Sequence, residues 1–113
     1  MKENETYVKS HITSLRGKQL YTLDQKKPFT VDGIKGNLIL ITTSTKASRN
    51  APLQGTIDAY NHLKKRGVLT LVEIRENNYS EWNPVYIAAI LASFPEIEYK
   101  TRPITLFLKS QKL

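Results

Sequence analysis

The sequence predicts one α+β domain, in which a small N-terminal β-sheet region is followed by a helix, a short helix, a third helix and a β-hairpin. Three observations predict this order. Residues 19–43 contain apolar runs between turn residues, two later segments repeat apolar residues at helical spacing, and the last segment alternates apolar and polar residues. The chain has 113 residues, 40% of them hydrophobic and 24% charged, which is ordinary globular usage with room for one core. We therefore expect residues 1–113 to form a single domain.

The first part of the chain is expected to form a weak helix and a small sheet. Residues 1–16 are polar, and their few apolar residues recur at helical spacing, which predicts a weak helix with a frayed start. Strands are expected at residues 20–23, 29–31 and 37–43. Asp32-Gly33 is expected to form a turn between two of them. Because residues 38–41 are apolar on both alternating faces, their strand is expected to be central or covered on both sides.

Residues 44–50 are polar and basic, and we expect them to form a loop. Lys46 and Arg49 lie among hydroxyl side chains just before the start of a predicted helix. Positive charge, hydroxyl donors and helix amides together suit phosphate oxygens, which makes Lys46, Ser48 and Arg49 candidate contacts with a nucleic-acid backbone. A solvated loop without a partner is the alternative interpretation.

The best-defined helix is expected to follow this loop. Asn50 is its predicted cap, with Pro52 in the first turn, and apolar residues recur on one face as far as Leu63. Residues 64–66 are all basic, as the negative end of a helix dipole favours, and Gly67 can adopt the left-handed conformation that ends a helix.

Two further helices and a hairpin are expected beyond Gly67. Thr70-Leu71-Val72-Glu73 matches a capping box, which predicts a short helix over residues 71–76, although residues 69–74 also suit a strand. A third helix is predicted over residues 83–94, capped by Asn83 and with Pro84 at its first position. Residues 96–109 then alternate as two strands joined near Arg102.

The order of elements over residues 50–109 resembles the winged helix-turn-helix fold. Gly67, the capping box at Thr70, the Asn83-Pro84 pair and the terminal hairpin carry the resemblance. It implies that the third helix enters the major groove of DNA and that the hairpin loop touches the backbone. The contacts that it implies are Asn83 and Tyr86 near the helix start, and Lys100 and Arg102 in the hairpin.

The face of the third helix opposite its apolar stripe is poor in groups that read bases. It consists of Val85, Ala88, Ala89 and Ala92. Base edges are read by longer polar side chains, so we expect contacts with the DNA backbone to dominate and sequence readout to be weak. Small side chains also let another surface come close. A homodimer or a protein partner that packs on this alanine-rich face is therefore the alternative function.

The charge balance favours a polyanionic partner. Seventeen Lys and Arg against ten Asp and Glu give a formal charge of +7 and an isoelectric point near 9.7. Such an excess attracts nucleic acid, and with the resemblance above we expect DNA rather than RNA. A basic domain without a nucleic-acid partner is the alternative.

No catalytic constellation stands out, so we expect a protein that is not an enzyme and needs no metal or cofactor. His11 and His62 are far apart in the chain, and no cysteine can help them to bind zinc. Asp58 and residues 73–75 only loosely match a metal-dependent nuclease, because Asp58 falls in a predicted helix. Tyr79 and Trp82 could stack on unpaired bases, or fill the gap between the second and third helices.

The sequence predicts a cytoplasmic protein that does not enter a membrane. The chain lacks cysteine, its start is polar with no apolar segment behind it, and its longest aliphatic run is residues 38–41.

Overall fold

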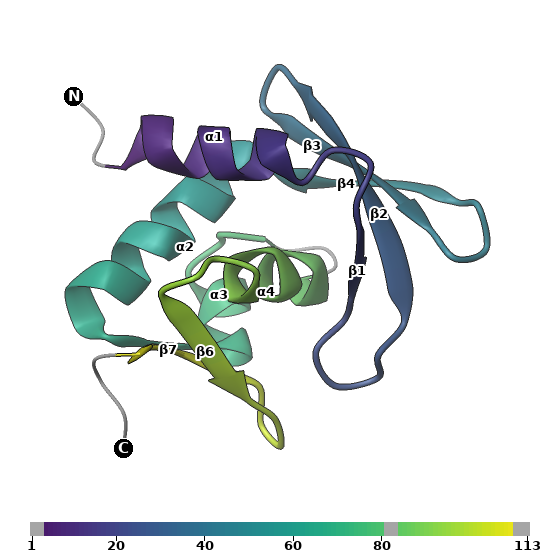
Figure 1. Ribbon diagram of the computed structural model, residues 1–113. Helices are drawn as coiled ribbons and strands as arrows, with labels where there is room; N and C mark the ends of the chain where they lie inside the picture. The colour runs from purple at the N-terminus through teal and green to yellow at the C-terminus, as the bar shows by residue number, and fades with distance from the viewer. Residues whose placement is uncertain (1–3, 81–83, 110–113) are drawn as a thin grey trace.

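The computed structural model describes residues 4–80 and 84–109, and the fold is α+β, as predicted (Figure 1). In chain order the elements are α1 (Glu5–Ser14), β1 (Gln19–Tyr21), β2 (Pro28–Lys35), β3 (Leu38–Thr43), β4 (Ser48–Pro52), α2 (Leu53–Arg66), β5 (Val68–Thr70), α3 (Leu71–Glu76), α4 (Pro84–Ala92), β6 (Ile97–Lys100) and β7 (Thr105–Leu108). The strands form two antiparallel sheets, an N-terminal sheet in the order β1-β2-β3-β4 and a C-terminal sheet in the order β5-β7-β6. Helix α4 lies between the two sheets (Figure 1).

The N-terminal sheet contains the three predicted strands and one that the sequence did not predict. β3 pairs with β2 on one side and with β4 on the other, so its predicted central position is confirmed. Only its inner face is covered, because Ile39 and Ile41 are buried whereas Leu38 is exposed. The prediction that Asp32-Gly33 forms a turn is wrong. These residues lie inside β2, where a β-bulge lets Gly33 take a φ of 137°.

Helix α2 begins at Leu53, and neither Asn50 nor Pro52 plays the predicted part. Asn50 belongs to β4, and Pro52 stands at the N-cap position with no capping side chain. The cap comes instead from Asn37, in the turn between β2 and β3. Its carbonyl oxygen accepts from the Leu53 amide at 2.9 Å, and its Oδ1 accepts from the Gln54 amide at 2.9 Å. A residue distant in sequence thus satisfies the first amides of the helix.

The predicted ends of α2 and α3 are confirmed. Gly67 ends α2 with a φ of 83°, and its amide donates to the Leu63 carbonyl at 2.7 Å. The capping box of α3 is complete, because the Glu73 amide donates to Thr70 Oγ1 at 3.1 Å and the Thr70 amide donates to Glu73 Oε1 at 2.9 Å. The ambiguity over residues 69–74 resolves into the end of strand β5 and the start of helix α3.

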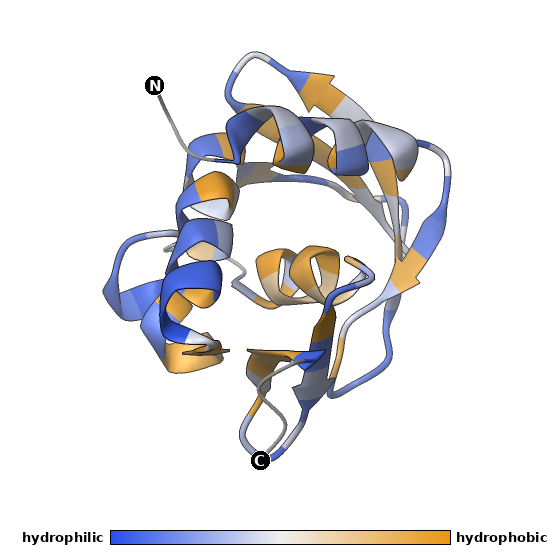
Figure 2. Ribbon diagram, turned by 60° about the vertical axis from the view of Figure 1, so that its left-hand side comes forward, coloured by the Kyte–Doolittle hydropathy of each residue, from blue (hydrophilic) through white to orange (hydrophobic). Residues whose placement is uncertain are grey.

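Helix α4 is the central element of the core. It spans Pro84–Ala92, two residues short of its predicted end, and it contacts β1 and β4 of one sheet and β6 and β7 of the other. Figure 2 shows it as a hydrophobic helix enclosed by the other elements. Both Ala88 and Ala89 are buried, at 0% and 4% exposure. The alanine-rich face is therefore occupied within the domain, and the expectation that it offers itself to a partner is wrong. The small side chains let the sheets approach the helix closely.

A carboxylate joins α1, α2 and the start of the C-terminal hairpin. Glu96 accepts hydrogen bonds from the hydroxyls of Tyr60, at 2.5 Å, and Tyr7, at 2.9 Å. Burial acts to raise the pKa of Glu96, but the hydrogen bonds from Tyr60, from a backbone amide and from Tyr7 outweigh it and hold the pKa below 4.5. Nearby, His11 stacks on Phe94 with ring centroids 3.9 Å apart, and burial lowers its pKa below 6.5.

These two groups predict a stability that falls in two steps on acidification. The unfolded chain takes up a proton at His11 and at Glu96 before the folded chain does, so stability falls below pH 6.5 and again below pH 4.5. Urea unfolding from neutral pH to about pH 3 measures both steps. His11→Gln should remove the upper step and Glu96→Gln should reduce the lower one. Parallel curves for the wild type and His11→Gln as the pH falls through the upper step would contradict the assignment.

Candidate functional site

The three candidate contacts before α2 do not form the predicted loop. Ser48 and Arg49 are exposed residues of strand β4, and only Lys46 lies in a turn. Because Ser48 pairs with Thr42 and Arg49 with the buried Ile41, Ser48 points to the outer face of the sheet and Arg49 to the inner face. The helix amides that were expected to join them already have Asn37 as their partner. The predicted phosphate cradle at this helix start is therefore wrong, although each cation remains accessible.

The candidate residues of the third helix and of the C-terminal hairpin are placed more favourably. Lys100 ends β6 and Arg102 lies in the turn between β6 and β7, and both are exposed. Tyr86 is half-buried in the first turn of α4, where its ring meets Phe29 edge-on at 5.0 Å. Asn83 lies outside the described residues.

A groove of about 350 Å³ opens where the two halves of the chain meet. We call it the loop–turn groove. Its walls are the loop between β1 and β2, the start of α3, the first turn of α4 and the β6–β7 turn. The lining residues are Thr22, Asp24, Gln25, Lys27, Leu71, Val85, Tyr86 and Ile104.

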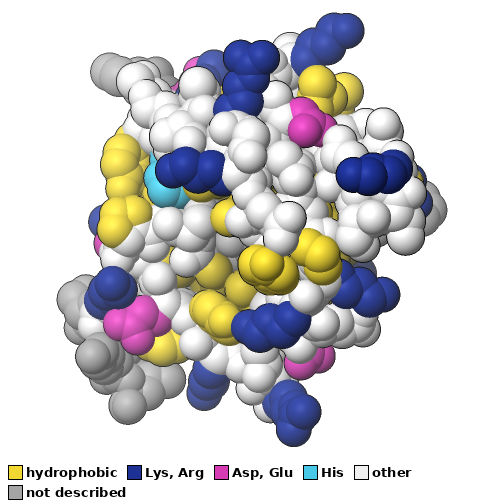
Figure 3. Space-filling view, turned by 45° about the vertical axis from the view of Figure 1, so that its right-hand side comes forward, with side chains coloured by type: hydrophobic (Ala, Val, Ile, Leu, Met, Phe, Trp, Pro, Cys, Tyr) yellow, Lys and Arg dark blue, Asp and Glu magenta, His cyan; other side chains and the backbone are white. Residues whose placement is uncertain are grey.

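Beside this groove, Lys26 connects the loop between β1 and β2 to strand β6. Its ammonium donates to the Tyr99 hydroxyl at 2.7 Å and lies 5.1 Å from the centre of the Tyr99 ring. Lys27, Lys100 and Arg102 are exposed and form no ion pair with any carboxylate of residues 4–80 or 84–109. Figure 3 shows Lys and Arg side chains spread over the side of the molecule that carries the N-terminal sheet, with fewer acidic side chains among them.

Three hairpin turns place a cation in the left-handed backbone region. Lys26 has a φ of 58°, Lys46 of 68° and Arg102 of 64°. We call these residues the hairpin-tip cations. Glycine adopts this conformation freely, whereas a residue with a Cβ atom loses about 1–2 kcal/mol there. The turn between β2 and β3 does use glycine, since Gly36 has a φ of 59°. That turn lies at the top of Figure 1, away from the other three.

Comparisons with family models, curated proteins and solved structures find no match to this chain. Within the described residues, no three His, Cys, Asp or Glu side chains gather as a metal site would require, and no helix is long and apolar enough to cross a membrane.

The sequence identified Lys46, Lys100 and Arg102 as candidate contacts. It did not indicate that Lys26 stands at a hairpin tip and contacts Tyr99. The Lys26-Lys27 pair before Pro28 is visible in the sequence as turn chemistry. The signal that sets Lys26 apart is its backbone conformation and its contact with Tyr99, 73 residues further along the chain. Neither can be read from local sequence.

Proposed function

We propose that this protein binds nucleic acid, DNA in preference to RNA, through its hairpin turns and mainly by contacts with phosphates. The hairpin-tip cations carry the proposal. At each tip a long charged side chain stands where glycine would be free of strain, and strained positions of this kind cluster at functional sites. Lys27, Arg49 and Lys100 supply further exposed charge beside them.

The element order supports a winged helix-turn-helix reading of residues 53–108. Helix α2, strand β5, helices α3 and α4 and the β6–β7 hairpin follow one another as expected, and β5 pairs with β7. Under this interpretation, the β6–β7 turn, which carries Arg102, corresponds to the wing. We propose that it follows the backbone or the minor groove, as hairpin loops of that family do.

Helix α4 cannot act as a recognition helix along its length, because both sheets cover it. Its middle is buried, and its start reaches the surface at Val85 and Tyr86 in the loop–turn groove. We therefore propose loop contacts rather than insertion of a helix into the major groove. Asn83 stays the candidate for base reading, and backbone contacts should give affinity with little sequence preference.

Fluorescence anisotropy with unrelated DNA and RNA duplexes at about 50 and about 200 mM salt tests this function. The wild type should bind all DNA duplexes similarly and lose roughly tenfold or more in affinity at the higher salt. The triple variant Lys26→Gly, Lys46→Gly, Arg102→Gly should flatten the salt slope by about three units, because each neutralised phosphate adds close to one. It should keep its thermal stability, since glycine relieves the backbone strain.

The matched control removes the same charge elsewhere, by Lys35→Ala, Lys64→Ala and Lys109→Ala. These three lysines are exposed and lie outside the three turns. An equal loss of affinity in the control would mean diffuse attraction and would reject the proposed surface. Absence of binding to every duplex at the lower salt would reject the function itself.

A further inference from the structure

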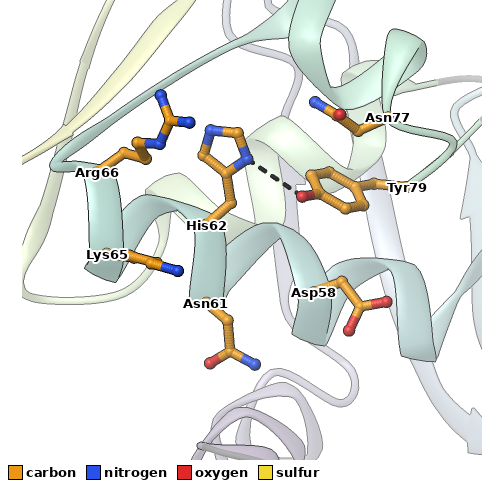
Figure 4. Close-up of a pocket in the computed structure, with 7 residues that line it drawn as sticks. All are labelled: Asp58, Asn61, His62, Lys65, Arg66, Asn77 and Tyr79. Carbon is orange, nitrogen blue, oxygen red and sulfur yellow. Dashed lines mark hydrogen bonds between the residues drawn. The ribbon is translucent and has the colours of Figure 1, made fainter.

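A second hollow, of about 480 Å³, lies along helix α2 and shares no lining residue with the loop–turn groove. Its volume falls in the range of about 300–1,000 Å³ that is typical of small-molecule sites. One wall is the face of α2 that carries Asp58, His62 and Lys65, with Arg66 beside them. The opposite wall is the turn after α3, with Asn77 and Tyr79 (Figure 4).

Close backbone contact between α2 and the turn after α3 positions Tyr79. A Cβ atom at Gly55 would lie 1.8 Å from the Tyr79 carbonyl oxygen, so the two backbones meet where only glycine fits. The Tyr79 amide also donates to the Ile74 carbonyl at 3.0 Å. The Tyr79 ring therefore stands edge-on to His62, at 5.8 Å between centroids.

His62 occupies the middle of the hollow with its hydrogen bonding incomplete. Its Nδ1 lies 3.1 Å from the Tyr79 hydroxyl, whereas its buried Nε2 finds no hydrogen-bond partner among the described residues. Glu73 Oε2 lies 3.9 Å from the His62 Nε2. Figure 4 shows the Arg66 and Tyr79 side chains on either side of the His62 ring.

Charge is distributed unevenly along the hollow. Lys65 and Arg66 stand in the last turn of α2 and are exposed, without an ion-pair partner among residues 4–80 and 84–109. Asp58 lies two turns earlier, which is about 10–12 Å along the helix axis. A ligand that spans the hollow thus meets positive charge at one end and a carboxylate at the other, with the His62–Tyr79 pair between them.

We propose that this hollow binds a phosphorylated nucleoside. The phosphate would pair with Lys65 and Arg66, because guanidinium and ammonium groups are the usual phosphate partners. The far end would present the amino or hydroxyl donors of its base or ribose to the Asp58 carboxylate. Burial, followed by the negative fields of Asp58 and Glu73, raises the pKa of Tyr79, so its hydroxyl stays protonated and able to hydrogen-bond between the two ends.

Titration of the whole protein with adenosine 5′-monophosphate, followed by NMR of the histidine rings, tests the site. The chain has only two histidines, so His11 is an internal control for His62. The nucleotide should shift the His62 ring signals and leave those of His11 in place. Lys65→Ala with Arg66→Ala should weaken binding about tenfold or more. Lys64→Ala, which removes an exposed charge from the same helical turn, should change it less than about twofold.

Further titrations identify the two ends of the ligand and its source. Asp58→Asn should weaken the nucleotide while leaving ribose 5-phosphate unchanged. Competition by a 5′-phosphorylated DNA strand, but not by its 5′-hydroxyl form, would assign the phosphate to a strand end, and failure of both to compete would assign a free nucleotide. If about 10 mM nucleotide leaves the His62 signals in place, or if Lys64→Ala costs as much as the Lys65 and Arg66 pair, the site is rejected. These outcomes do not depend on duplex binding by the hairpin turns.

Discussion

Replacing Gly55 by alanine should lower the stability of the domain by about 3 kcal/mol or more. Gly55 is buried in helix α2, and the new Cβ atom would lie 1.8 Å from the Tyr79 carbonyl oxygen and 2.8 Å from the Tyr79 carbonyl carbon. Backbone atoms cannot swing aside as a side chain can, so the turn that carries Tyr79 has to leave the helix. The sign of the effect is informative, because alanine would otherwise stabilise a helix by about 1 kcal/mol relative to glycine.

Thermal unfolding monitored by circular dichroism measures this change. A loss of about 3 kcal/mol should lower the midpoint by roughly 12 °C in a domain of this size. Gly36→Ala is the matched control. Its Cβ atom would meet nothing within 4 Å, so only the left-handed conformation is penalised, at about 1 kcal/mol. A higher midpoint for Gly55→Ala would show that the helix and the turn do not touch.

Replacing Ala88 by leucine should cost about 3 kcal/mol, because α4 is enclosed between the two sheets. Ala88 has no exposed surface, and the leucine side chain adds three carbon atoms where β-strands and helices already fill the space. If this face met a second protein instead, the same change would leave the stability of the monomer intact and alter its state of association.

Chemical denaturation and analytical ultracentrifugation of the two forms separate these outcomes. We expect a lower denaturation midpoint and an unchanged sedimentation coefficient at concentrations where the variant stays folded. Ala92→Leu is the control, since Ala92 is half-buried at the end of α4 and a longer side chain there can extend toward solvent. A wild-type midpoint for Ala88→Leu would contradict the central position of α4.

Local sequence predicted those elements whose signals lie within a few neighbouring residues. The capping box at Thr70 satisfies amides three residues away, and Gly67 ends α2 through a bond to Leu63. The hairpin of β6 and β7 and the position of Pro84 at the start of α4 are equally local. Such signals act before any long-range contact forms, and a single sequence therefore reveals them.

Strand β4 was missed because its own residues do not alternate. Ser48, Arg49 and Asn50 are polar and exposed, and they are held in the sheet by backbone pairing with β3. Whether a polar segment becomes an edge strand depends on the free amide and carbonyl groups of the neighbouring strand. The cap of α2 was missed for a related reason, since Asn37 reaches the helix from a turn in the sheet.

The candidate sites likewise combine features that the sequence shows with features that only the tertiary structure decides. Composition by itself determined the excess of positive charge, and the sequence identified Lys46 in a loop and Lys100 and Arg102 in the hairpin, because charge and turn residues are properties of the chain. Only the tertiary structure decided that Lys26 meets Tyr99, that Gly55 brings Tyr79 to His62, and that the alanine face of α4 is core. These three outcomes depend on which distant segments of the chain pack together. Apolar burial is non-directional and does not by itself specify which segment meets which.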